Sequence, residues 1–284
     1  MTQHLRTWQV SGKPWTFGEM PSLMGIVNVT PDSFSDGGKW TSLSAAVDHA
    51  LQLAADGAEI LDIGGESTRP DADPVSEVEE LARVIPVISR LAGLTKVPIS
   101  IDTMKAAVAR EALAAGAQIV NDVSALTADP RMTEVCANST CGVIVMHMQG
   151  TPKTMQLNPH YEDVVQEVDA YLQTRVDQLA AAGIHPDRIM IDPGVGFGKT
   201  AQHNLELLSN VCKFRASGRP VLIGHSRKGF LGKLVGRKVD NRLASTIGVS
   251  IALAEQHADV LRVHDVAAVR DAILAWHTIR QVVS

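Results

Sequence analysis

Eight short apolar runs are the feature that most constrains the fold of this chain. They are continuous in apolar character rather than alternating, which is typical of parallel strands buried on both faces. Longer amphipathic segments separate them, so the pattern predicts an α/β protein of eight strand–helix units. The runs are Leu23–Val29, Glu59–Ile63, Pro98–Asp102, Gln118–Asn121, Val143–Met146, Arg188–Asp192, Pro220–Gly224 and Val260–Val263.

The segments between these runs carry helix signals. Ser76 and Glu79 form a capping-box pattern at the start of one helix, and Pro86 is expected to kink or shorten it. The longest helix is expected from about Tyr161 to Ala182. The other expected helices include Ala45–Asp56 and a final one that carries Val266, Val269, Ile273 and Trp276.

Eight such units fit either a doubly wound open sheet or a closed (β/α)8 TIM barrel. The number of units and the length of 284 residues favour the barrel, although periodicity alone does not prove closure. Since no Ser/Gly/Pro-rich linker interrupts the chain, residues 1–284 are expected to form a single domain. Residues 5–17, with a Ser-Gly-Lys turn, are expected to form a short N-terminal hairpin.

Composition excludes several classes of protein. A net charge of -5 and a pI of about 6.0 argue against a general nucleic-acid partner. No apolar stretch reaches the ~20 residues that span a bilayer, and the N-terminus lacks the apolar region of a secretory signal. Three sparse cysteines argue against a disulfide framework, and Cys136 with Cys141 lacks further zinc ligands at suitable spacing. We therefore expect a cytoplasmic protein without a membrane partner.

Polar side chains follow every strand-like run. In a TIM barrel the chemistry lies at the carboxyl ends of the strands. One such residue is usually a helix cap or a loop residue, but a full ring at one rim indicates a functional site. The ring consists of Asn28, Glu66, Thr68, Arg69, Asp102, Asn121, His147, Asp192, Ser226, Arg227, Lys228, Arg262 and His264.

Two acids and an amide in this ring suit a flat heterocycle. Asp102, Asn121 and Asp192 would offer acceptors and a donor to a guanine-like edge, since adjacent ring N–H and NH2 groups bind one carboxylate bidentately. Lys228 would then face the ring carbonyl. The simpler alternatives are that Asp102 caps the helix near Lys105 and that Asp192 is only a turn residue.

Arg262, His264 and Arg69 form a cationic set that suits an anionic leaving group. Arginine offers a planar fork to phosphate oxygens, and histidine can donate from its ring. The alternatives are a structural histidine at position 264 and a solvated loop charge at position 69.

The glycine-rich run DPGVGFGKT, residues 192–200, does not fit a nucleotide motif. Only three residues separate Gly194 from Gly198, where the P-loop needs four, and Lys199 breaks the dinucleotide fingerprint. The glycines are expected to permit tight turns and close approach to a ligand. Phe197 would be exposed at the rim, either to contact a flat aromatic substrate or simply for packing.

The loop after the first run, NVTPDSFSDGGKW, is polar and rich in turn residues. Asn28, Asp32 and Asp36 are oxygen donors that suit Mg2+, which is often shared with substrate phosphates. An ordinary aspartate in a turn is the alternative at each position.

Eight motifs together resemble dihydropteroate synthase, in the order of that family and from about Leu23 to the last helix. They are MGIVNVTPDSFSDGG, DIGGESTRP, SIDT, NDVS, MHMQGTPKTMQ, DPGVGFGK, SRKGF and RVHDV. The resemblance implies a (β/α)8 barrel, usually a homodimer, that joins a pterin pyrophosphate to p-aminobenzoate in folate biosynthesis. It also implies Mg2+ as cofactor and inhibition by sulfonamides, which mimic p-aminobenzoate.

The resemblance further implies roles for individual residues. The pterin pocket would contain Asp102, Asn121, Val123, Met146, Asp192 and Lys228. Pyrophosphate would be held by Asn28, Arg262 and His264, and the metal by Asn28 and Asp36. Thr68 and Arg69 would lie near substrate, and the p-aminobenzoate site would be bordered by Pro70, Phe197, Ser226 and Lys228. The residues expected to act in catalysis are Asp102, Asp192, Lys228, Arg262 and His264.

Departure of pyrophosphate is expected to run ahead of attack by the arylamine, with closure of loops 30–41 and 66–75 excluding water. A folate-dependent methyltransferase is one competing hypothesis, but such enzymes work with a cobalamin module for which the chain has no room. A non-catalytic pterin-binding paralogue is the other, and it is disfavoured because the first loop, SRK and RVH are intact.

Overall fold

The computed structural model describes residues 6–30, 39–68 and 72–283. Eight parallel strands form one sheet in the order β8-β7-β6-β5-β4-β3-β10-β9. A bridge between Ile191 and Val221 joins its two outer strands, so the sheet closes and the open doubly wound alternative is wrong. The strands are β3 (Ser22–Asn28), β4 (Ile60–Gly64), β5 (Ile99–Asp102), β6 (Ile119–Asp122), β7 (Gly142–Met146), β8 (Ile189–Asp192), β9 (Leu222–Gly224) and β10 (Val260–Val263).

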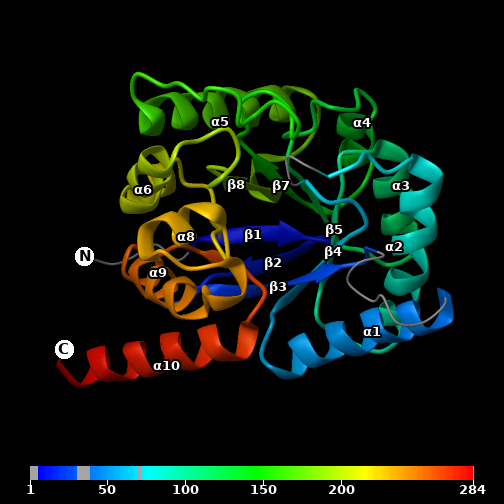
Figure 1. The fold of residues 1–284 in the computed structure, drawn as a ribbon. Helices are drawn as coiled ribbons and strands as arrows, with labels where there is room; N and C mark the ends of the chain where they lie inside the picture. The colour runs from blue at the N-terminus through cyan, green and yellow to red at the C-terminus, as the bar shows by residue number, and fades with distance from the viewer. Residues whose placement is uncertain (1–5, 31–38, 69–71, 284) are drawn as a thin grey trace.

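Helices surround the barrel and bury one face each against the sheet (Figure 1). The expected TIM-barrel fold is therefore confirmed. The helices are α1 (Lys39–Ala55), α2 (Glu77–Ala92), α3 (Ala106–Ala114), α4 (Met132–Ala137), α5 (Val164–Ala181), α6 (Ala201–Ser209), α7 (Val211–Arg215), α8 (Gly229–Val235), α9 (Leu243–Glu255) and α10 (Val266–Val283), with short 3-10 turns η2 (Pro186–Arg188) and η3 (Val239–Asn241). No helix of the described residues is both long and apolar enough to span a bilayer.

Helix α2 departs from its expected form in two ways. The Ser76 side chain accepts from the Glu79 backbone N–H, but the Glu79 carboxylate pairs with Arg83 one turn later. Only half of the expected capping box is therefore observed. The helix also continues past Pro86 to Ala92, so Pro86 does not shorten it, and the kink that was the other expectation stays a prediction. Pro86 is exposed, which lets water satisfy the carbonyl that it leaves unpaired, while the opposite face stays buried in the core.

The N-terminal hairpin closes the bottom of the barrel. Strands β1 (Thr7–Val10) and β2 (Lys13–Thr16) pair antiparallel, which confirms the expected hairpin for the part of residues 5–17 that is described. Trp8 is fully buried and donates from its indole Nε1 to the Arg188 carbonyl at 2.8 Å. Trp8, Val10 and Phe17 pack against the inward-facing residues Met24, Ile60, Ile119, Ile144, Met190, Leu222 and Val260. The bottom of the barrel is thus an apolar plug.

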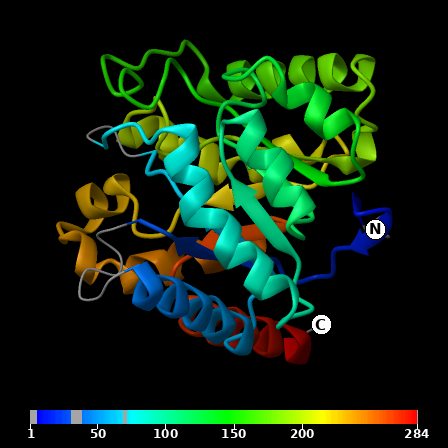
Figure 2. The same ribbon diagram turned by 90° about the vertical axis from the view of Figure 1, so that its right-hand side faces the viewer.

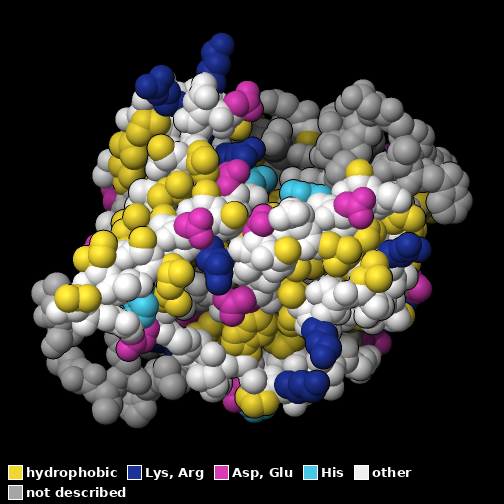
Figure 3. All heavy atoms as spheres, turned by 90° about the horizontal axis from the view of Figure 1, so that it is seen from below, with side chains coloured by type: hydrophobic (Ala, Val, Ile, Leu, Met, Phe, Trp, Pro, Cys, Tyr) yellow, Lys and Arg dark blue, Asp and Glu magenta, His cyan; other side chains and the backbone are white. Residues whose placement is uncertain are grey.

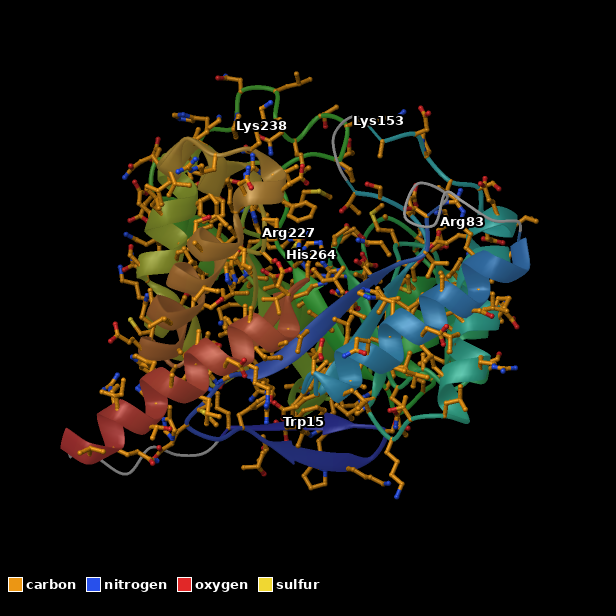
Figure 4. The ribbon with its side chains drawn as sticks, turned by 60° about the horizontal axis from the view of Figure 1, so that its bottom comes forward. Trp15, Arg83, Lys153, Arg227, Lys238 and His264 are labelled. Atoms are coloured by element: carbon orange, nitrogen blue, oxygen red, sulfur yellow. The ribbon has the colours of Figure 1, made fainter. Side chains whose placement is uncertain are left out.

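A polar layer lies directly above this plug. Side chains alternate between the two faces of a strand, so the next inward-facing position lies two residues further along. On most strands that residue is polar, and the layer consists of Asp62, Ser100, Asn121, Asp192 and Arg262. The loops that follow β4 and β10, which carry Thr68 and His264, lie beyond this layer at the rim. Figure 4 shows Trp15 of the hairpin at one end of the barrel and Lys153 and Lys238 at the other.

The two ends of the barrel are well separated along its axis. In Figure 2 the hairpin lies at right and α8, which follows the carboxyl end of β9, lies at left. The side of the molecule that carries α1 and α10 mixes basic and acidic side chains, as Figure 3 shows. Because the polar layer lies toward the carboxyl ends of the strands, the candidate active site is at the rim above it.

Replacing Trp8 with alanine is expected to lower the free energy of unfolding by about 3–5 kcal/mol, because a large plug side chain leaves a cavity. Urea denaturation followed by circular dichroism measures this change. Trp8→Phe retains most of the packing and is expected to cost less. Trp15→Ala, on the half-buried face of the same hairpin, is the control. Equal costs for Trp8→Ala and Trp15→Ala would contradict the role of Trp8 as a plug.

Candidate active site

An arginine held by two carboxylates forms the centre of the polar layer. Arg262 Nε donates to Asp62 Oδ2 at 2.6 Å, and its Nη2 donates to Asp102 Oδ2 at 2.7 Å. Asn121 also donates to Asp62 Oδ2, at 3.2 Å, and lies beside Asp102 in the register of β5 and β6. The structure thus brings Asp102, Asn121 and Arg262 together, as the sequence predicted. Asp102 does not cap α3, whose N-cap residue is Lys105.

Asp62 is a site residue that the sequence reasoning missed. It lies within β4 rather than at the strand's end, and its side chain is completely buried. Its Oδ1 has no hydrogen-bond partner among the described residues. The signal was present, because an aspartate inside an otherwise apolar strand is almost never buried unless it is paired. The alternation of the strand then points it inward.

Arg262 was expected to bind pyrophosphate from the rim. In the structure its Nε and Nη2 donate to Asp62 and Asp102 inside the barrel mouth, and its role toward pyrophosphate stays a prediction. Burial raises the pKa of the Asp102 carboxyl to about 7, with Asp62 adding to the rise and Arg262 opposing it. The positive charge of Arg262 therefore offsets the cost of burying the charged carboxylates of Asp62 and Asp102.

Asp192 closes a turn and also lies in the polar layer, so its turn role does not rule out the ligand role that the sequence left open. Its Oδ1 accepts from the Gly194 N–H at 2.7 Å, so it closes the turn after β8. It is also buried in the polar layer, and burial raises the pKa of its carboxyl, against the charge of Lys228. Met146 is its register partner, and Met146 and Val123 are both buried at the ends of their strands. Their expected role as walls of a heterocycle pocket stays a prediction.

Lys228 meets the glycine-rich loop after β8. Its ammonium donates to the Val195 carbonyl and lies 4.6 Å from the centroid of the Phe197 ring. Burial lowers the pKa of Lys228 to about 8, with Asp192 opposing the shift. Phe197 is half-buried rather than exposed as expected, consistent with the lysine lying against its ring.

Ser226 and His264 form a pair at the ends of β9 and β10. The Ser226 hydroxyl lies 3.0 Å from His264 Nδ1, and it also accepts from the His264 backbone N–H at 3.3 Å. The adjacent Arg227 has a φ of 58° and forms a bidentate ion pair with Asp265. Figure 4 shows Arg227 and His264 close together on the rim side of the barrel. Ser226 therefore orients the histidine ring. The sequence predicted Ser226 beside p-aminobenzoate and did not predict this contact with His264.

The remaining expected residues lie on the first two loops. Asn28 is exposed at the end of β3, beside Gly64 in the register, and Thr68 is half-buried. Asp36, Arg69 and Pro70 lie outside the described residues. The described residues contain no group of three or more His, Cys, Asp or Glu that would hold a metal unaided. The exposed amide of Asn28 fits a Mg2+ ion shared with substrate phosphates rather than one held by a protein cage.

A half-buried lysine that bridges two glutamates anchors the start of the second loop. Lys105 Nζ lies 2.5 Å from Glu66 Oε2 and 2.5 Å from Glu80 Oε2. Glu66 Oε1 also accepts from the Val75 N–H at 3.0 Å, which ties the two ends of loop 66–75 together. Glu66, a member of the predicted ring, thus has a structural partner, and Lys105 was missed because its partners are distant in sequence.

Pterin affinity is expected to be greatest between about pH 7 and 8. Below this range the raised pKa of Asp102 means that its carboxylate is progressively protonated and lost as an acceptor. Above it the lowered pKa of Lys228 means that its positive charge is lost. Calorimetric titration with a pterin across about pH 5.5–9.5 measures the profile, since this range extends roughly 1.5 units below the pKa of Asp102 and above that of Lys228. Asp102→Asn should remove the acid limb and Lys228→Met the alkaline limb; an unchanged profile in both variants would refute these assignments.

Comparison with known proteins agrees with this geometry. The family of pterin binding enzymes matches residues 24–264. A dihydropteroate synthase of Haemophilus influenzae is 46% identical over 257 residues, which cover 90% of this chain and 93% of that protein. The structure of Xanthomonas albilineans dihydropteroate synthase with 4-aminobenzoic acid has a TM-score of 0.91 and 46% identity, covering 97% of this chain and 98% of that chain. A sulfonamide complex of Yersinia pestis dihydropteroate synthase has a TM-score of 0.90 and 40% identity, covering 97% and 99%.

A closed barrel whose mouth carries buried acids around an arginine is thus a pterin-binding enzyme by both fold and family. More narrowly, the chain belongs to the dihydropteroate synthase family. It is a transferase that forms dihydropteroate in folate biosynthesis. This membership favours the synthase over a folate-dependent methyltransferase.

Proposed function

We propose that the chain transfers the pterin-methyl group of 6-hydroxymethyl-7,8-dihydropterin pyrophosphate to p-aminobenzoate. The products are 7,8-dihydropteroate and pyrophosphate. The observation that carries the proposal is the cluster of Asp62, Asp102 and Asn121 around Arg262. Acceptors, an amide and one delocalised cation above an apolar floor suit a flat, hydrogen-bonding bicycle.

The pterin is held by its two polar edges. Asp192 accepts from the adjacent ring N–H and exocyclic amine, and Lys228 donates to the ring carbonyl. Asp102 and Asn121 serve the opposite edge, with Val123 and Met146 against the ring faces. The burial of Asp192 supports this role, because a desolvated carboxylate gains most from a bidentate partner.

The leaving group is held on the rim side of the pterin. His264, oriented by Ser226, donates a hydrogen bond to pyrophosphate, and Arg262 supplies positive charge from below. Asn28 and Asp36 would hold Mg2+, which would supply positive charge that makes pyrophosphate a better leaving group. The support is the exposed amide of Asn28 at the barrel mouth.

Bond breaking precedes bond formation. The C–O bond between the methylene and pyrophosphate breaks, and its electron pair leaves with pyrophosphate. The ring shares the resulting positive charge, which Asp102 and Asp192 stabilise. The lone pair of the arylamine then forms the C–N bond, and the nitrogen loses a proton. p-Aminobenzoate lies beside Phe197 and Lys228, with Thr68 nearby; Arg69 and Pro70, which were also expected there, lie outside the described residues.

A pyrophosphate-release assay tests this function. The purified chain with both substrates and Mg2+ is expected to release pyrophosphate in proportion to dihydropteroate formed. Omitting p-aminobenzoate is the first control, and omitting Mg2+ is the second. Binding of the pterin without any release of pyrophosphate would instead favour a non-catalytic paralogue.

We also propose that sulfonamides compete with p-aminobenzoate at the Phe197 side of the site. The sulfonamide complex of the Yersinia pestis relative supports this, given 40% identity over nearly the whole chain. The proposed compartment is the cytoplasm, and the free state of all three cysteines fits a reducing environment.

A homodimer is the proposed assembly, with α8 and α9 at its interface. The apolar side chains of Leu234, Val235, Val239 and Leu243 are exposed there. Light scattering after gel filtration should give about twice the 30.4 kDa mass of one chain. Val239→Glu is expected to give monomers, because a desolvated carboxylate in the interface has no partner. Ile279→Glu, on exposed α10, is the control; a monomeric parent protein would overturn the proposal.

A further inference from the structure

The glycine-rich loop 193–199 lies directly on the chain that follows β7. A Cβ atom on Gly194 would lie 1.8 Å from the His147 carbonyl oxygen, and one on Gly198 would lie 2.8 Å from Gln149 Cβ. Both glycines also have positive φ, of 72° and 64°. The loop and residues 147–149 are therefore packed backbone against backbone, and only glycine fits at these contacts.

Lys199 ties these two segments together from inside. Lys199 is only 3% exposed, so contact with solvent does not explain why a lysine occupies this position. Its ammonium donates to the Phe197 carbonyl at 2.9 Å and lies 3.0 Å from His147 Nδ1. Burial and the nearby lysine charge lower the pKa of His147 to about 3, so the imidazole is neutral and Nδ1 can accept. The pair is thus a directed hydrogen bond rather than a repulsion between two cations.

The surroundings fix His147 in turn. Its ring meets Tyr171 edge-on at 4.9 Å and lies 6.0 Å from the Tyr161 ring. Tyr161 also donates from its hydroxyl to the Gly198 carbonyl at 2.9 Å. The charged groups within electrostatic reach of Lys199 are Asp192 and Lys228. Helix α5, which carries Tyr171, therefore serves as a rigid base for the loop.

One residue of the loop, Phe197, faces substrate in the proposed function. Phe197 presents its ring to Lys228, whose ammonium also takes a hydrogen bond to the Val195 carbonyl. Lys199 binds the carbonyl of Phe197 itself, so it acts on the residue that borders the p-aminobenzoate site. A small displacement of a substrate-contacting ring is enough to lower binding substantially.

We propose that Lys199, seated on His147, is a positioning residue that fixes Phe197 for the second substrate without touching either substrate. The inference rests on the proposed function, since it takes Phe197 as part of the p-aminobenzoate site. It assigns the buried lysine of the DPGVGFGKT run to the architecture of that site rather than to phosphate binding. The pterin side of the site also rests on the polar layer of β4, β5, β6 and β10, while Asp192 and Lys228 are the pterin-binding groups that contact the loop.

Steady-state kinetics of Lys199→Met test the inference. We expect KM for p-aminobenzoate to rise about tenfold or more, with pterin affinity by calorimetry within about threefold of the parent. Lys199→Gln retains one donor for the Phe197 carbonyl and should give an intermediate KM. His147→Phe keeps the aromatic packing but removes the acceptor, and adding it to Lys199→Met should raise KM little further. Lys213→Met, on exposed α7, is the matched control for loss of a positive charge.

Three outcomes would overturn the inference. They are an unchanged KM in Lys199→Met, a loss of pterin affinity as large as the rise in KM, and full additivity of Lys199→Met and His147→Phe. The thermal melting of each variant shows whether it is folded, and Lys199→Gln serves if Lys199→Met is not. The parent protein is assayed alongside: if it releases no pyrophosphate, the proposed function itself fails, whereas an active parent with an unaffected Lys199→Met variant sinks only the positioning role.

Discussion

Asp192→Ala is expected to reduce pterin affinity at least a hundredfold. The carboxylate is buried at the end of β8, so two charge-assisted hydrogen bonds to the ring would contribute about 3 kcal/mol or more. Calorimetric titration with a pterin measures the loss directly. The alanine also removes the acceptor for the Gly194 N–H, so the turn after β8 needs its own control.

Asp192→Asn supplies that control. Its side-chain oxygen can still accept from Gly194, but it can no longer bind two donors of the ring with a full negative charge. We expect a parent-like melting temperature together with weak pterin binding. Undiminished affinity in Asp192→Ala would remove Asp192 from the site.

Arg262→Ala is expected to have the widest effects of any single change at the rim. A role in holding pyrophosphate, which the resemblance implies, would by itself mainly slow turnover. Because Arg262 neutralises Asp62 and Asp102, its loss leaves two buried carboxylates facing each other. Breaking such a buried group typically costs about 3–5 kcal/mol, so we expect lower stability and weaker pterin binding as well as slower turnover.

Urea denaturation, calorimetry and initial rates separate these three effects. Arg262→Lys keeps a positive charge but cannot reach both acids with a planar fork, so it should recover stability more than activity. Asp62→Asn in the Arg262→Ala background should restore part of the stability, because it removes one of the unpaired charges. A stable Arg262→Ala protein with parent-like pterin affinity would contradict the role assigned to this triad.

The barrel was predictable because its signals are local. The ends of the predicted apolar runs differ from the ends of the observed strands by at most two residues. The run Val260–Val263 matches its strand at both ends. The expected helix from about Tyr161 begins at Val164, where the Asp163 side chain caps it through Val165 and Gln166. Closure could not be predicted from periodicity, because open and closed sheets have the same pattern of strands. It depends on the contact between Ile191 and Val221, which no local pattern encodes.

The site was predictable only at the ends of strands. Reading those ends found Asp102, Asn121 and Asp192, which the structure places at the barrel mouth. Asp62 belongs to the same layer but was missed because it lies inside β4, two residues before the strand's end, where uniformly apolar side chains were expected. Lys199 was used only to reject a nucleotide motif, because its partner His147 is on another strand's loop. Pairings between distant segments are fixed by the register of the barrel, and no local pattern encodes them.

A crystal structure of the chain with a bound pterin tests the central claim most directly. The ring is predicted to lie on the polar layer, with its N–H and amino edge within hydrogen-bond distance, about 2.7–3.2 Å, of the Asp192 carboxylate. Asp102 and Asn121 should contact the opposite edge while Arg262 keeps its bonds to Asp62 and Asp102. A pterin bound outside the barrel mouth, or one that leaves Asp192 and Asn121 without contact, would contradict this account.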